Sequence, residues 1–176
     1  MKKALAVTIF AALMMISSAA VAQTTASGTL TVSATVNGSI QLVFNSDAAG
    51  VALTGGGTNA ATLAFGNVSA FGTVAAGVTR TATASNFTVS SAVDVQVSKT
   101  NSTSANYTLK AQLGTADATN TWSVGGVAVT SAAQATVTAT GTYASNVNFP
   151  VAITVPFTTT GGTTISNTIN YVATAN

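Results

Sequence analysis

The chain of 176 residues contains no cysteine, no histidine and no glutamate. Without cysteine there is no disulfide framework, no thiolate zinc site and no lipid attachment through a cysteine. A catalytic Ser–His–Asp or Cys–His arrangement is excluded as well. General acid–base chemistry would fall to a few aspartates and lysines. We therefore predict no enzyme activity, no catalytic residue, no cofactor and no metal.

Charge is also scarce, with only 5% of the residues charged. Two of the five basic residues, Lys2 and Lys3, lie in the N-terminal stretch. Beyond residue 22 three basic residues balance three acidic ones: Arg80, Lys99 and Lys110 against Asp47, Asp94 and Asp117. Because basic and acidic residues are equal in number, there is no basic patch for nucleic acid and no polybasic segment for anionic lipid.

The first 22 residues have the features of a bacterial signal peptide. Lys2 and Lys3 precede an apolar run over residues 4–16, and Ala20-Val21-Ala22 is a small-residue cleavage site. The run is too short for a membrane-spanning helix. We predict a secreted protein that passes through the periplasm, is not membrane-spanning after signal removal, and begins at Gln23.

What the remaining chain has in abundance is alternation of apolar and small polar residues, the period of a half-buried β-strand. Gly-rich turns separate the alternating segments, and no segment after residue 22 shows a helical period. This pattern predicts an all-β fold, an antiparallel sandwich of about eight to ten short strands.

Two hairpins are expected inside this sandwich. In "TWSVGGVAVT", a two-residue turn at Gly125-Gly126 would place Val124 opposite Val127 and Trp122 opposite Val129. Residues 93–97 and 107–113 have matching parity. Paired as neighbours, they would place Val97 opposite Tyr107, Val95 opposite Leu109 and Asp94 opposite Lys110.

The stretch "TASGTLTVSATVNGSIQLVFN" carries no charge, although exposed strand edges are normally protected by charges, proline or bulges. One face carries Leu30, Val32, Ala34 and Val36, and after Asn37-Gly38 a second set follows, Ile40, Leu42 and Phe44. A two-residue turn would put the second set on the wrong face. The segment is therefore either a hairpin with a three-residue bulged loop over residues 36–38, pairing Ala34 with Ile40, or two separately placed strands.

Few residues suit ligand chemistry. Asp47 and Asp117 lie in loops and are candidates for calcium, although a turn residue bonding its own backbone is the simpler interpretation. Asp94 and Lys110 are expected to form a cross-strand ion pair on the solvent face. Trp122 is a candidate for stacking on a sugar ring, but a lone tryptophan in a hairpin is more often part of the core.

Several short motifs occur in a recognisable order: an alternating N-terminal segment leading into "GSIQLVF", then "ATLAFGNV", "FPVAITVPF", a Gly-rich turn and a last strand with Tyr171. This order resembles the bacterial secreted pilin-like sandwiches of the chaperone–usher and spore-coat-U-like class. The resemblance covers most of residues 24–176.

The resemblance implies an incomplete immunoglobulin-like sandwich, completed by the N-terminal extension of the next subunit. Residues 23–37 would be the donor extension and residues 38–176 the sandwich domain. It further implies self-association into a homopolymer, a periplasmic chaperone, an outer-membrane export partner, and a fimbrium at the cell surface. The assembly residues would be Leu30, Val32, Ala34 and Val36 on the donor, and Ile165, Ile169 and Tyr171 beside the groove.

Two other interpretations fit the same residues. In one, the chain is a self-contained secreted sandwich in which residues 28–36 pair within their own domain, since sequential strands often do so. In the other, the domain is an adhesin or a carbohydrate-binding module that uses exposed aromatic residues.

The processing prediction can be checked directly. Because Ala20-Val21-Ala22 is the expected cleavage site, exported protein should begin at Gln23. N-terminal sequencing and intact mass will show this, and an exported form that retains Met1 would contradict it.

Overall fold

The computed structural model describes residues 26–176, so the predicted signal peptide, residues 1–22, and its cleavage site before Gln23 lie outside the described residues. The chain divides into two units, Met1–Thr35 and Val36–Asn176. In the described part of the first unit, residues 26–35, every residue is exposed and none belongs to a strand. Every strand found among residues 26–176 belongs to the second unit.

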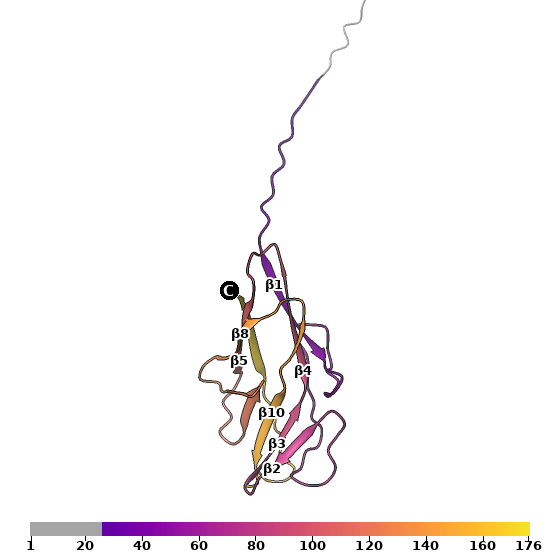
Figure 1. Ribbon diagram of the computed structural model, residues 1–176, viewed down its shortest axis with the longest axis vertical. Coiled ribbons are helices and arrows are strands. Elements are labelled where there is room, and N and C mark those ends of the chain that lie inside the picture. The colour runs from indigo at the N-terminus through magenta and orange to yellow at the C-terminus, as the bar shows by residue number, and fades with distance from the viewer. Residues whose placement is uncertain (1–25) are drawn as a thin grey trace, which may run out of the picture. The chain divides into compact units, whose positions relative to one another are not determined.

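The second unit is all-β, with eleven antiparallel strands in three sheets and no helix among residues 26–176 (Figure 1). The predicted antiparallel sandwich class is confirmed, with one strand more than expected. The immunoglobulin-like topology stays a prediction. The strands are β1 Ser39–Ser46, β2 Thr79–Ala82, β3 Asn86–Ser91, β4 Val93–Thr100, β5 Tyr107–Leu113, β6 Thr121–Val124, β7 Val127–Val129, β8 Ala135–Gly141, β9 Asn146–Asn148, β10 Val151–Pro156 and β11 Ile169–Ala175.

One long ladder joins two of the sheets. The three sheets have the orders β1-β4-β9, β2-β3-β10-β6-β7 and β11-β5-β8. β3 and β4 are separated only by Ala92, and their partners β10 and β9 only by Phe149 and Pro150. The register does not shift across this break. Pro150 fits there because it has no N–H to offer a ladder.

The predicted hairpin at Gly125-Gly126 is confirmed. Trp122 pairs with Val129 and Val124 with Val127. Both glycines have positive φ, 58° and 80°, as the two central residues of a type I′ turn require. Trp122 and Val124 are buried, so the turn determines which side of the hairpin enters the core.

The predicted pairing of residues 93–97 with 107–113 is wrong. β4 pairs with β1 and β9, whereas β5 pairs with β11 and β8, in another sheet. The faces were nevertheless predicted correctly, because Val95 and Leu109 are fully buried in one core cluster. Alternation specifies which side chains point inward, but it does not identify the neighbouring strand.

The same correction removes the predicted ion pair between Asp94 and Lys110. Asp94 lies opposite Asn45 of β1 and Asn148 of β9. Lys110 lies opposite Val172 of β11 and Thr136 of β8. Because the two charged residues belong to different sheets, they are not cross-strand neighbours.

A close contact between Gly141 and Tyr107 provides a test of the core. A Cβ at Gly141 would lie 2.2 Å from the ring of Tyr107, which is fully buried. Gly141→Ala should therefore destabilise the fold by about 1–3 kcal/mol. Gly161→Ala is the matched control, since a Cβ there meets nothing within 4 Å. Its effect should stay within about 0.5 kcal/mol.

Urea unfolding followed through Trp122, the only tryptophan, measures both variants. Equal stability of the Gly141 variant and the wild type would contradict the packing described for Tyr107.

Candidate functional site

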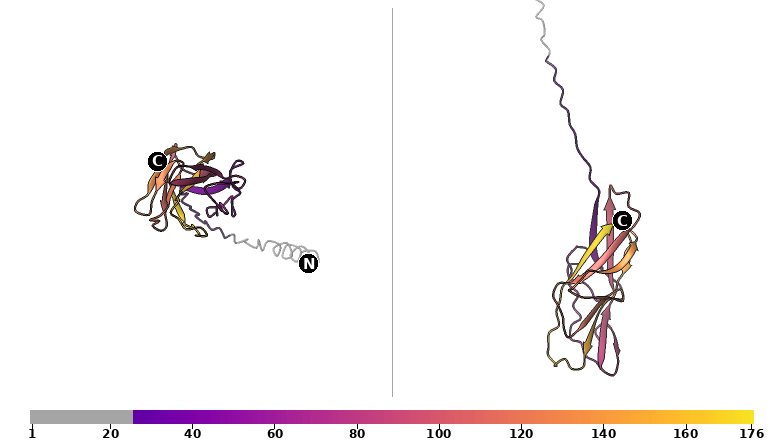
Figure 2. Two further views of the ribbon diagram at one scale, coloured as in Figure 1. Left: turned by 90° about the horizontal axis from the view of Figure 1, so that it is seen from below. Right: turned by 90° about the vertical axis from the view of Figure 1, so that its left-hand side faces the viewer.

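Two strand edges enclose a groove in the second unit. β1 is the edge strand of one sheet and β11 is the edge strand of another, and the two are not paired with each other. They lie side by side and run in opposite directions (Figures 1 and 2). The groove between them has a volume of about 920 Å³. It is lined from β1 by Ile40, Gln41, Leu42 and Phe44, from the chain at β11 by Thr168, Ile169, Asn170 and Tyr171, and by residues 57–62.

The groove is a gap in the cover of the core. Ile40, Leu42 and Phe44 share the face of Val95 and Val97 in the neighbouring β4. Val95 and Val97 are fully buried, but the three β1 side chains remain partly exposed. The same holds for β11: Ile169 and Tyr171 remain partly exposed, whereas their β5 neighbours Leu113 and Ala111 are buried. The core is therefore incompletely covered along the line between β1 and β11.

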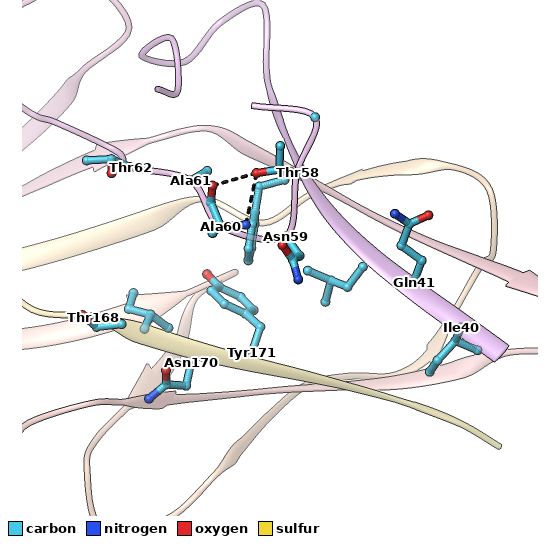
Figure 3. A pocket seen from close by; sticks show the side chains of 14 residues that line it. Ile40, Gln41, Thr58, Asn59, Ala60, Ala61, Thr62, Thr168, Asn170 and Tyr171 are labelled. Atoms are coloured by element: carbon cyan, nitrogen blue, oxygen red, sulfur yellow. Dashed lines mark hydrogen bonds between the residues drawn. The ribbon is translucent and has the colours of Figure 1, made fainter. Parts of the chain in front are cut away.

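Aromatic side chains form the floor of the groove. The rings of Phe44 and Tyr171 meet edge to face, with centroids 5.0 Å apart. Figure 3 shows Tyr171 reaching from β11 toward the loop residues Ala60 and Ala61. Burial raises the pKa of the Tyr171 phenol well above its ordinary value, so the group is neutral at physiological pH. No residue that lines the groove carries a charge.

The strand edges direct backbone groups into this groove. On β1, the N–H of Phe44 donates to Thr58 O and its C=O accepts from Gly57 N, on the side away from β4. Ile40 and Leu42 have the same parity, so their N–H and C=O groups face the same way. On β11, the C=O of Thr168 and the N–H of Asn176 bond toward β5, so the backbone N–H and C=O groups of Ile169 and Tyr171 point to the other side, where the groove lies.

The predicted donor residues are highly exposed. Leu30 is 88%, Val32 81% and Val36 72% exposed, and Ala34 is exposed as well. No strand is formed over residues 26–38, so the bulged hairpin that would pair Ala34 with Ile40 is not formed.

The predicted groove residues are only partly brought together. Ile169 and Tyr171 line the groove, whereas Ile165 precedes β11 and packs, partly buried, against the core. Sequence reasoning missed the contribution of β1 and of residues 57–62. The alternation of Ile40, Leu42 and Phe44 could have indicated β1, but no local signal places a loop against it.

The residues considered for ligand binding have structural partners. Asp47 and Asp117 each accept backbone N–H groups from residues two or three positions later, as turn residues do. Trp122 is buried and donates its Nε1–H to Asp117 Oδ2 at 2.8 Å. Within residues 26–176, the exposed aromatic residues are Phe71 and Phe157, whose ring centroids lie 6.2 Å apart.

Comparisons with known proteins add no identification: no protein-family model, no curated protein and no solved structure matches this chain. Among residues 26–176 there is no helix long and apolar enough to span a membrane. Over the same residues, no three potential metal ligands of the His, Cys, Asp or Glu type lie together.

The Asp117 cluster predicts an acid-sensitive contribution to stability. Partial burial acts to raise the pKa of Asp117, but hydrogen bonds from Asn120, Trp122 and Thr119 outweigh it and lower the pKa from 3.8 to about 2. A lowered pKa stabilises the fold above the unfolded-state value and loses that effect as the pH falls toward the folded-state value. Asp117→Asn should therefore be less stable than wild type at pH 6, with the difference vanishing between about pH 4 and pH 2.

Asp94→Asn is the control of opposite sign. Partial burial and the nearby charge of Asp47 raise the pKa of Asp94, so its ionised form does not stabilise the fold and its loss should not destabilise at pH 6. The free energy of unfolding measured from pH 6 to 2 tests both variants. A deficit of Asp117→Asn that is independent of pH would contradict the assignment.

Proposed function

We propose that this protein is a secreted structural subunit of a surface fibre, and that it polymerises by strand addition. Residues 28–36 of one copy fill the groove between β1 and β11 of a second copy. The observation that carries this proposal is that two edge strands, β1 and β11, border a groove over a partly uncovered core without pairing with each other. The proposal explains why residues 28–36 have no charge or proline to protect them from pairing with another chain.

Segment and groove match in chemistry. Residues 28–36 carry no charge, and no charged residue lines the groove. Leu30, Val32, Ala34 and Val36 share one face of an extended chain and would turn that face to the floor. Backbone groups of the added strand would bond both edges, which supplies affinity, while the alternate side chains supply specificity.

Both apolar burial and ladder hydrogen bonds would favour addition. Burying a valine or leucine side chain contributes about 1.5–3 kcal/mol, and each ladder bond adds about 0.5–1.5 kcal/mol net. Because donor and groove belong to different parts of one subunit, the contact is head-to-tail. Such a contact does not close upon itself and builds a fibre.

The same exposed surfaces indicate that the subunit needs protection during export. A subunit with an open groove and a free apolar strand is prone to wrong pairing before assembly. We therefore include a periplasmic chaperone and an outer-membrane export partner in the proposal, with the cell surface or a fimbrium as the final location. Catalysis has no part in it.

The alternative proposal is a self-contained surface domain with an adhesin or carbohydrate-binding role. Phe71 favours it, because this ring is 75% exposed on a turn that Arg80 holds through hydrogen bonds to Ser69 O and Gly72 O. A monomer that does not assemble at any concentration, and whose ligand binding is lost in Phe71→Ala, would support this alternative over the fibre.

The donor role can be tested by deletion. A chain that lacks residues 23–36 should fold but not assemble, because it has no donor segment to insert into the groove of the next copy. A synthetic peptide of residues 23–36 should bind the groove and raise its thermal stability. Native gels and thermal unfolding measure both effects. If the deletion unfolds the domain and the full-length chain stays monomeric, the segment belongs to its own domain.

A charge placed on each face of the segment gives a sharper test in the full chain. Val32→Asp would carry an unpaired carboxylate into the apolar groove and should block assembly. Ser33→Asp is the matched control, since the same charge one residue later faces away from the floor. Both positions are exposed outside the strands, so neither change should unfold the subunit. Equal assembly of the two variants, by native gel and electron microscopy, would contradict the proposal.

A further inference from the structure

One end of the groove is closed by a compact loop, residues 54–62, which we call the strap. Its neck is closed by two backbone hydrogen bonds, Thr54 N to Thr62 O at 3.0 Å and Thr62 N to Thr54 O at 2.8 Å. Inside, Thr58 Oγ1 lies 2.7 Å from the carbonyl oxygens of both Gly55 and Ala60. Figure 3 shows the contact between Thr58 and Ala60. The strap is thus tied to itself independently of the groove.

The strap is also attached to β1, at one residue. Phe44 N donates to Thr58 O at 2.8 Å, and Gly57 N donates to Phe44 O at 2.7 Å. These two bonds take both backbone groups that Phe44 directs away from β4. The attachment depends on a glycine. Gly57 has a φ of +82°, and a residue with a side chain, above all a β-branched one, adopts this backbone angle only with strain.

The strap therefore limits what β1 offers to a partner. Upstream of Phe44, only Ile40 and Leu42 direct an N–H and a C=O into the groove, within the five residues Ser39–Val43. An added strand pairs with β1 residue for residue, so a partner strand can follow β1 over about five residues. Beyond that point the strap occupies the position of the partner.

We infer that the strap acts as a ruler, restricting the added strand to a window of about five residues paired on both sides. This inference rests on the proposed function and adds to it the length and position of the recognised segment. Residues 28–36 are longer than the window. One continuous part of this segment is therefore paired with both β1 and β11, and the remaining residues are not.

A proline scan of residues 28–36 in the full chain measures the window. Between two edges each N–H of the added strand bonds one edge or the other, and proline has none to donate. Proline inside the window should slow assembly at least tenfold, and proline outside it less than about twofold. The scanned residues are exposed and lie outside every strand, so these substitutions should not unfold the subunit.

Releasing the strap should widen the window. Gly57→Val forces a β-branched residue into a left-handed conformation and should free the backbone groups of Phe44. The proline-sensitive stretch should then grow by about two residues, since ladder positions on one edge recur every second residue. Gly162→Val is the matched control, because Gly162 has a similar φ of +84°, open space around it, and no place in the groove lining.

The outcomes separate the two proposals. Sensitivity confined to about five consecutive positions in wild type supports the ruler, and a wider stretch in Gly57→Val alone supports the strap as its cause. If proline slows assembly at every position from 28 to 36, the ruler is overturned and strand addition still holds. An unchanged window in a folded Gly57→Val chain has the same consequence. No sensitivity at any position contradicts strand addition itself, and the ruler with it.

Discussion

Two strand edges that face each other without pairing are the constraint on which this structure depends. β1 and β11 belong to different sheets, and each turns its apolar side chains to a common core that remains partly open between them. A sandwich usually covers such a line with another strand, because unpaired backbone groups beside apolar surface invite association. Here the Phe44–Tyr171 contact covers only the floor.

The remainder of the domain holds these edges in position. β4 lies between β1 and β9, and β5 lies between β11 and β8, so each edge strand pairs with a strand whose inward apolar side chains are buried. The continuous ladder from β3–β4 to β9–β10 then joins the sheet of β1 to the five-stranded sheet. No charged residue lines the groove, and the Asp117 carboxylate accepts a hydrogen bond from the buried Trp122 elsewhere in the domain.

The errors of sequence reasoning have one physical origin. The inward faces of β4 and β5 were predicted correctly because side-chain direction alternates along a strand and depends on its own residues. Their pairing was predicted wrongly because two strands of matching parity can lie side by side or in facing sheets, and the pattern is the same in both. The expected contact of Asp94 with Lys110 failed for that reason. The Gly125-Gly126 hairpin succeeded because a two-residue turn determines the register by itself.

The sequence by itself determined the all-β class, the inward residues of the core strands, the hairpin at Gly125-Gly126 and the absence of charge over residues 28–36. These properties depend on composition, local backbone preference and alternation, which act over a few residues. Only the tertiary structure decided that β1 and β11 border the same groove, that Ile165 lies outside it, and that residues 54–62 close one end at Phe44. The groove brings together β1 and β11, which lie more than a hundred residues apart along the chain, and such long-range contact leaves no trace in local patterns.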